Sequence, residues 1–171
     1  MLYHEEELEN EGIKYALSLL AGAIKTAPKS KGINTLQTIV LTDKDKDRIA
    51  DEMQKNEKTA FQRDSINLKK AQAVILIGVK TLHIGLDCGM CRHKDCNESK
   101  EKNGLCIFNL TDLGIALGSL VSSASQMKID NRIMYTIGFT AKNMGFFEKE
   151  YDIIMGIPLS YNHKNIFFDR K

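Results

Sequence analysis

The sequence has no tryptophan, only two prolines and only 7% aromatic residues among its 171 positions. Proteins that bind single-stranded nucleic acid usually stack the bases on aromatic side chains, and few are available here. An excess of one charge is also lacking, because 24 basic residues are balanced by 22 acidic ones to a formal net charge of +2. Nucleic-acid-binding domains normally carry a basic patch or stripe. We therefore expect no nucleic-acid partner.

Long hydrophobic runs are missing as well. No uninterrupted apolar run approaches the roughly 20 residues of a membrane-spanning helix. The first residues, MLYHEEELENEG, are acidic and lack the basic start and apolar run of a secretory signal. We expect no membrane partner and a cytoplasmic location. The length predicts a single domain over residues 1–171, and 43% hydrophobic with 27% charged residues is ordinary for a globular protein.

Hydrophobic periodicity predicts helices alternating with apolar strands. The expected helices cover residues 5–27, 43–58, 60–71, 107–129 and 141–149, and the expected strands cover 36–42, 73–80, 131–140 and 151–160. The continuous apolar run AVILIGVK, residues 73–80, is typical of a strand covered on both faces. The pattern predicts the α+β class, with a mixed β-sheet flanked by helices. GxGxxG and P-loop signatures are absent, so the sequence gives no local support for a standard nucleotide-binding fold.

Cysteine is absent from most of the chain and concentrated in one stretch. DCGMCRHKDCNESKEKNGLC, residues 87–106, has the spacing Cys88-x2-Cys91-x4-Cys96-x9-Cys106. In a reducing cytosol, clustered cysteines are more often metal-binding or catalytic than disulfide-bonded. Three close cysteines and a distant fourth are typical of cubane iron–sulfur clusters, and Gly89 relaxes the turn between the first two.

Two other interpretations of the cysteines remain open. A structural zinc held by all four would make the protein a non-enzymatic binding module, although tetrahedral zinc usually takes two CxxC-type pairs and this chain has one. A redox sensor would use Cys88 and Cys91 as a switching dithiol and leave the other two unexplained. His83 and His93 lie nearby in the sequence and are further candidate ligands, although such histidines are more often surface residues.

The segment DCGMCRHKDC resembles the cluster loop of anaerobic electron-transfer proteins. In that loop, Cys-Gly-x-Cys, four residues and a third cysteine precede a later fourth cysteine, and together they hold a [4Fe-4S] cluster. Gly89 and Cys96 match the motif, whereas the nine-residue gap before Cys106 is shorter than is common there. The resemblance implies that Cys88, Cys91, Cys96 and Cys106 are the metal ligands.

The chain as a whole resembles a family of bacterial and archaeal proteins described as containing a ferredoxin domain. The stretches that carry this resemblance are TAPKSKG (26–32), AVILIGVK, the cysteine loop, DLGIALGSLVSSA (112–124), DNRIMYTIG (130–138) and MGIPLSYNHKNIFFDR (155–170). It implies a ferredoxin-like loop at 87–106 inside the single domain but no settled activity, and the cysteines themselves indicate an iron–sulfur redox protein. Such a protein would transfer single electrons to a partner protein or to a small-molecule acceptor.

A more distant resemblance is to the nitroreductase fold. TAPKSKG resembles the Ala-Pro loop that touches the flavin ring there, and DLGIALGSLVSSAS resembles the long central helix at a dimer interface. This implies an oxidoreductase of nitroreductase-like type, with FMN held near Pro28, Lys29 and Lys31, and a homodimer. The chain departs from that pattern at HEEELENE, residues 4–11, where nitroreductases have an Arg-rich segment for the flavin phosphate.

Small residues recur along the expected helix 107–129. Gly114, Gly118 and Ser122 are four positions apart and share one face, which lets another backbone approach closely. This face is either closely packed inside one core or forms a dimer seam. The sequence shows no set of residues that matches an acid–base pair or an activated nucleophile, so we name no catalytic residue.

Overall fold

The computed structural model describes residues 1–168 and confirms the α+β class. The helices are α1 (Glu5–Thr26), α2 (Asp43–Gln54), α3 (Thr59–Lys70), α4 (Cys96–Glu101), α5 (Ile107–Gln126) and α6 (Tyr135–Asn143), and the strands are β1 (Leu36–Thr42), β2 (Ala73–Lys80), β3 (Asp130–Asn131) and β4 (Tyr151–Ser160). A single 3-10 turn, Ser30–Gly32, follows α1. The expected helices at 5–27, 43–58, 60–71 and 107–129 are present, and three of the expected strands coincide with β1, β2 and β4.

The four strands form one open sheet in the order β1-β2-β4-β3. Every strand pair within the described residues is antiparallel, with Ile39 opposite Leu76 and Ile75 opposite Ile157. We expected a mixed sheet, with parallel as well as antiparallel strands. That expectation was wrong in the direction of the strands. Hydrophobic periodicity reports which faces of a strand are buried, but it carries no information on the direction in which neighbours run.

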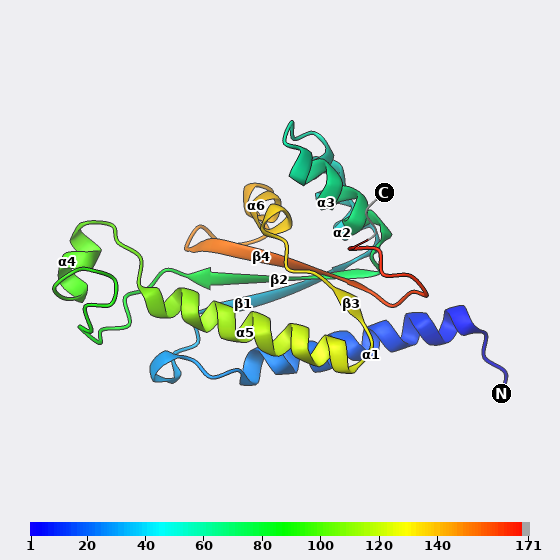
Figure 1. The fold of residues 1–171 in the computed structure, drawn as a ribbon, viewed down its shortest axis with the longest axis horizontal. Coiled ribbons are helices and arrows are strands. Elements are labelled where there is room, and N and C mark those ends of the chain that lie inside the picture. The colour runs from blue at the N-terminus through cyan, green and yellow to red at the C-terminus, as the bar shows by residue number, and fades with distance from the viewer. Residues whose placement is uncertain (169–171) are drawn as a thin grey trace.

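Helices cover both faces of the sheet and create two apolar cores (Figure 1). The side chains of β2 alternate between them: Ile75 and Ile77 pack with α1 and α5 on one face, while Val74 and Leu76 pack with α2, α3 and α6 on the other. All four of these side chains are fully buried. This double burial explains why the sequence of β2 is continuously apolar rather than alternating.

Residues 131–140 and 141–149 were assigned wrongly from the sequence. Instead of a strand followed by a helix, the chain makes the two-residue strand β3 and then the helix α6 over 135–143. Ile137 and Ala141 of α6 are fully buried and lie four residues apart, which is the spacing of one helical face. The β-branched and aromatic residues of this segment favour a strand locally, and packing against the sheet overrides that preference.

α5 runs beside α1 in the opposite direction on one face of the sheet (Figure 1). By length and composition alone α5 could cross a membrane, but its inner face packs against β2 as a core helix. Gly114, Gly118 and Ser122 lie on its outer, exposed face. A methyl group added at Gly114 or Gly118 would meet no described atom within 4 Å, so these residues are not there for close packing inside the core.

Candidate metal centre

The cysteine loop leaves the sheet at the end of β2 and forms a lobe beyond it. Residues 81–95 and the short helix α4 lie at the end of the sheet where α5 begins (Figure 1). The chain returns to the helix layer at Cys106, which is the N-cap of α5. Cys88 and Cys91 are thus on the outgoing loop, Cys96 is the first residue of α4, and Cys106 stands at the start of α5.

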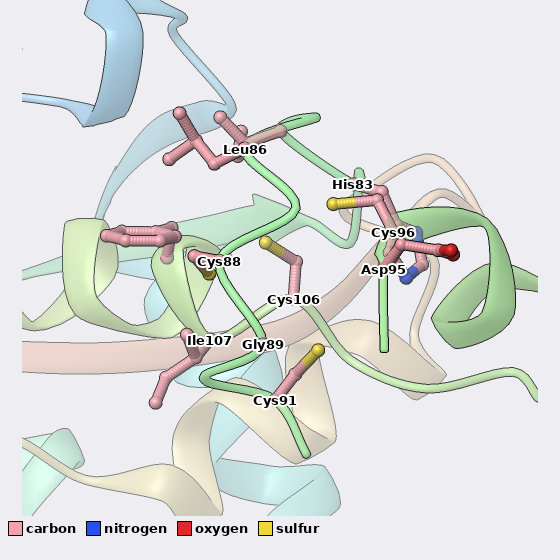
Figure 2. A pocket seen from close by; sticks show the side chains of 11 residues that line it. His83, Leu86, Cys88, Gly89, Cys91, Asp95, Cys96, Cys106 and Ile107 are labelled. Carbon is pink, nitrogen blue, oxygen red and sulfur yellow. The ribbon is translucent and has the colours of Figure 1, made fainter. Parts of the chain in front are cut away.

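All four cysteines line one pocket (Figure 2). The remaining wall is mostly apolar and includes Ile84, Leu86, Ile107 and Phe108, together with His83, Gly89 and Asp95. Cys106 is buried with 8% exposure, Cys91 and Cys96 are half-buried, and Cys88 is exposed. The short nine-residue gap therefore still allows Cys106 to reach the same pocket as the other three.

The cysteines surround the pocket without meeting at one point. Within residues 1–168, no group of three or more His, Cys, Asp or Glu side chains is arranged to hold a metal ion. A tetrahedral zinc needs its ligand atoms about 2.0–2.3 Å from a single centre. A cubane cluster is larger, and its irons each take a separate thiolate. Four thiols around one pocket are a donor set that either a cluster or a zinc ion could use.

The N-terminus of α5 gives the pocket a positive electrostatic environment. The first N–H groups of a helix have no partner within the helix, and the helix dipole adds partial positive charge there. Here those groups belong to Ile107 and Phe108, which line the pocket directly after Cys106. The first turn carries no acidic residue that would compete for them. An anionic group bound in the pocket beside Cys106 is stabilised by this position.

The loop folds tightly because several of its residues adopt left-handed backbone angles. Gly89 has φ of +69°, which confirms its expected role in the turn between Cys88 and Cys91. Asp87 and Arg92 adopt similar angles, with φ of +45° and +66°. Side chains other than glycine pay about 1–2 kcal/mol for this conformation, although aspartate tolerates it better than most. The pocket geometry therefore has to be held in place by other contacts.

Two aspartates hold the beginning of α4, which carries Cys96. The Asp95 carboxylate accepts the backbone N–H of Glu98 at 2.8 Å and caps the helix. The Asp87 carboxylate accepts the backbone N–H of Cys96 at 2.8 Å. Hydrogen bonds from Cys96, first from its backbone and then from its side chain, lower the pKa of Asp87. Both aspartates thus shape the loop around Cys96.

His83 and Asn109 connect the outgoing loop to the two helices. The Nε2 atom of His83 lies 3.0 Å from the hydroxyl of the buried Ser99 in α4. The Asn109 side chain donates from Nδ2 to the carbonyl of Leu82. His83 lines the pocket and its Nε2 contacts Ser99, and its role as a further ligand stays a prediction.

Pro28, Lys29 and Lys31, the residues expected near a flavin, have different surroundings. Pro28 is exposed, and the Lys29 ammonium donates to the carbonyls of Ile24, Lys25 and Ala27, which end α1. Burial, followed by repulsion from Lys25, lowers the pKa of Lys29. The Lys31 ammonium reaches the carbonyl of Ile84, a pocket residue, at 3.4 Å. The loop at 28–32 and the cysteine pocket are thus neighbours.

Asp112 is a site residue that sequence reasoning missed. It is 2% exposed, and its carboxylate accepts the backbone N–H of Ser30 at 3.0 Å and the Ser30 hydroxyl at 2.8 Å. These bonds attach the loop at 28–32 to α5, two turns after Cys106. The sequence did offer a signal: Asp112 directly precedes the apolar stretch LGIALGSL, and a carboxylate buried in such a helix needs hydrogen-bond partners.

Comparison with solved structures identifies the fold. A nitroreductase family protein from Clostridium novyi has a TM-score of 0.63 at 15% identity, covering 86% of this chain and 72% of that one. The FMN-dependent nitroreductase from Clostridium difficile has a TM-score of 0.60 at 19% identity, covering 88% and 77%. A nitroreductase with bound FMN from Desulfitobacterium hafniense has a TM-score of 0.57 at 14% identity, covering 96% and 81%. At these identities the similarity establishes a nitroreductase-like fold.

Sequence comparison identifies the family. A protein of Archaeoglobus fulgidus is 38% identical over 182 residues, which cover 99% of this chain and 98% of the relative. A family model described as "Uncharacterized protein containing a ferredoxin domain (DUF2148)" matches residues 102–170, a range that includes Cys106. The chain therefore belongs to this family of proteins containing a ferredoxin domain.

Proposed function

We propose that the protein is an iron–sulfur redox protein in which Cys88, Cys91, Cys96 and Cys106 hold a [4Fe-4S] cluster. The observation that carries the proposal is that all four cysteines, and no cysteine elsewhere, line a single pocket. Membership of a family described as containing a ferredoxin domain supports the same chemistry. When bound, the cluster would supply one-electron transfer.

The residues around the pocket have distinct parts in this proposal. The four thiolates are the ligands, and the apolar wall of Ile84, Ile107 and Phe108 limits the access of water. The N–H groups at the start of α5 offset the negative charge of the thiolates. Cys88 and Met90 are exposed, so electrons would enter or leave on this side, to a partner protein or a small-molecule acceptor.

Oxygen-free purification followed by quantification of iron, sulfide and zinc tests the proposal. We expect about four irons and four sulfides per chain, together with the visible absorption of an iron–sulfur centre. Stoichiometric zinc without iron or sulfide would overturn the proposal and favour the alternative, a binding module with a structural zinc. That alternative has less support, since structural zinc usually takes two CxxC-type pairs and this chain has one.

The substitution Cys96→Ser separates a cluster from a two-thiol switch. It removes one iron ligand, so the variant should lose most of its iron and sulfide. A switch that uses only Cys88 and Cys91 would still oxidise and reduce reversibly. Asn97→Ser is the matched control, because this exposed neighbour changes without the loss of a thiol, and it should retain the cluster. Retention of the full cluster in the Cys96 variant would contradict its role as a ligand.

A bound flavin is a second candidate, favoured by the loop at 28–32. This loop is fastened to α5 by Asp112 and extends toward Ile84 through Lys31. Lys29 is occupied with the end of α1, so Lys31 is the lysine with an exposed side chain that would act on a flavin. Heat release of a yellow chromophore, identified by chromatography as FMN, would support this. Protein purified with a full cluster and without flavin, and unable to bind added FMN, would refute it.

A further inference from the structure

Three separate segments have to be held together for the cysteines to share one pocket. Residues 81–91 carry Cys88 and Cys91, α4 carries Cys96, and the start of α5 carries Cys106. Side chains other than the cysteines form hydrogen bonds between these segments. The question is which of these bonds determine the spacing of the ligands.

Asp87 connects the first segment to the second. It immediately precedes Cys88, and its Oδ1 accepts the backbone N–H of Cys96 at 2.8 Å. That N–H belongs to the first turn of α4, where no intrahelical acceptor exists. Asp87 adopts its left-handed conformation, φ +45°, in making this contact. One carboxylate thereby fixes the backbone of Cys96 relative to that of Cys88.

Asn109 connects the first segment to the third. It lies one turn after Cys106 in α5, is only 1% exposed, and donates from Nδ2 to the carbonyl of Leu82. Its Oδ1 is buried and has no hydrogen-bond partner within residues 1–168. A buried amide with an unsatisfied oxygen is uncommon and normally has a specific reason. Here the reason is the Nδ2 atom of the same amide, whose hydrogen bond to the Leu82 carbonyl joins α5 to the loop.

Ser99 binds the residues that lead from α4 to Cys106, through Gly104, and it also contacts the outgoing loop. The Ser99 carbonyl accepts the backbone N–H of Gly104 at 2.7 Å, and its hydroxyl contacts His83. A Cβ at position 104 would lie 2.6 Å from the Ser99 hydroxyl, so only glycine allows this approach. The segments therefore form a closed arrangement, in which Asp87 and Asn109 supply the side-chain bonds nearest to Cys96 and Cys106.

We propose that Asp87 and Asn109 are positioning residues that assemble the cysteine ligands before the cluster binds. This inference rests on the proposed function, because the ligands it concerns are those of the cluster. Neither residue is expected to touch the metal. Residues that orient metal ligands through hydrogen bonds typically change metal affinity or activity 10–100-fold when replaced. Their effect should therefore appear in cluster retention more than in the stability of the fold.

Asp87→Ala and Asp87→Asn distinguish the hydrogen bond from the charge. Asparagine retains an Oδ1 acceptor for the Cys96 N–H, whereas alanine does not. We expect iron loss to a chelator under anaerobic conditions to be about tenfold faster for Asp87→Ala and close to wild type for Asp87→Asn. If asparagine behaves like alanine, the acceptor is not what matters and the proposal fails for Asp87.

Asn109→Asp is the corresponding isosteric test in α5. It replaces the Nδ2 donor with an oxygen that faces the Leu82 carbonyl, so the bond is lost without a change in size. We expect iron loss to be accelerated about tenfold. Thr136→Val is the control for general destabilisation, because it removes a buried hydrogen bond to Asp64 in the opposite helix layer. If this control releases iron as fast as the Asp87 and Asn109 variants, their role is only structural.

A measurement on the apoprotein separates the failure of this inference from the failure of the proposed function. Dibromobimane is a short reagent that reacts with two thiols. Its crosslinking of Cys88 to Cys96 reports how often these two thiols are close together. Asp87→Ala should give severalfold less crosslink than wild type, and Asp87→Asn should not. If the wild-type protein binds no cluster but still crosslinks more than Asp87→Ala, the proposed cluster is refuted and the positioning role of Asp87 is retained. Equal crosslinking and equal iron retention in all variants would overturn the inference.

Discussion

At the scale of single residues, the buried carboxylates of this chain serve as anchors between elements. Asp112 binds Ser30 across 82 residues of sequence, and Asp64 accepts the Thr136 hydroxyl at 2.7 Å while it pairs with Arg63. Taking a carboxylate out of water is costly unless hydrogen bonds or an opposite charge replace the lost hydration. Each anchor therefore has a large effect when one partner is removed.

Asp112→Ala should release the loop at 28–32 from α5. The Ser30 N–H and hydroxyl would lose a charged acceptor, and hydrogen bonds to charged groups contribute about 1.5–3 kcal/mol. We expect the free energy of unfolding, measured by urea denaturation, to fall by about 2 kcal/mol. Asp112→Asn should lose less, because an amide oxygen can still accept one of these bonds. A loss below about 0.5 kcal/mol in the alanine variant would contradict the anchoring role.

Asp152 gives a pH-dependent test at the same scale. The Thr81 hydroxyl, followed by Lys142, lowers the pKa of Asp152 below its ordinary value of 3.8. Because the pKa is lower in the folded state, the stabilisation is fully present above the unfolded value and is lost as the pH falls through the folded one. Thr81→Val should therefore be less stable than wild type at neutral pH.

The difference in urea midpoint between Thr81→Val and wild type should stay constant from neutral pH down to about pH 5. It should then close as the pH drops below 3.8 and Asp152 becomes protonated. Thr111→Val is the control, since that hydroxyl donates to the backbone carbonyl of Ile107 rather than to a carboxylate. A difference for Thr81→Val that is as independent of pH as the control would contradict the assignment.

At the scale of elements, the position of α6 depends on two glycines. A Cβ at Gly138 would lie 1.9 Å from the carbonyl oxygen of Ile154, and a Cβ at Gly156 would lie 2.3 Å from the Ile137 side chain. Real Cβ contacts do not occur at such distances, so a larger residue at either position has to move the helix away from β4. The backbones of α6 and β4 are thus closer together than any residue larger than glycine would permit at these two positions.

Gly138→Ala should therefore destabilise the protein by about 3 kcal/mol, the upper range for overpacking. Gly22→Ala is the matched control in an open helical position of α1, where an added Cβ meets no described atom within 4 Å. It should stabilise the protein by about 0.5–1 kcal/mol, because alanine loses less backbone entropy than glycine. Both effects are measured by urea denaturation. A neutral Gly138→Ala variant would mean that α6 can shift at little cost.

The elements that sequence alone predicted are those whose burial pattern is regular. β2 has seven consecutive buried residues and α1 has Ile13, Leu17, Leu20 and Ile24 on one face, so both were recognised. α6 was not, because Tyr135, Ile137 and Phe139 favour a strand locally, and the helix forms through burial of Ile137 and Ala141 against the sheet. The antiparallel directions were also inaccessible, since pairing partners are distant in sequence.

The same distinction applies to the candidate site. The clustering and spacing of the cysteines predicted a common centre, and the structure brings all four to one pocket. Asp87 and Asn109 could not be singled out, because their partners are the backbone N–H of Cys96 and the carbonyl of Leu82. Backbone groups occur at every residue, so a side chain that binds one leaves no signal in the sequence.

At the scale of the whole molecule, the outer surface of the α1–α5 layer exposes several large apolar side chains. α5 exposes Leu110 and Ile115 beside the open glycines 114 and 118, and α1 exposes Leu19. Contiguous exposed apolar surface on a globular protein commonly marks a contact with another molecule. Small residues on a helix allow a second backbone to approach closely, so we propose a second copy of this chain as the partner.

Ile115→Glu tests this homodimer. If Ile115 is buried against a second copy, the added carboxylate has to be desolvated without a partner, and self-association should weaken at least about tenfold. Ile66→Glu is the matched control, because Ile66 is also exposed, on α3 in the opposite helix layer, and its substitution should not affect self-association. Sedimentation equilibrium measures both, and urea denaturation confirms that the variants fold. A monomeric wild type, or dissociation caused equally by both substitutions, would show that this face of α5 does not mediate pairing, and its apolar residues would then need another partner.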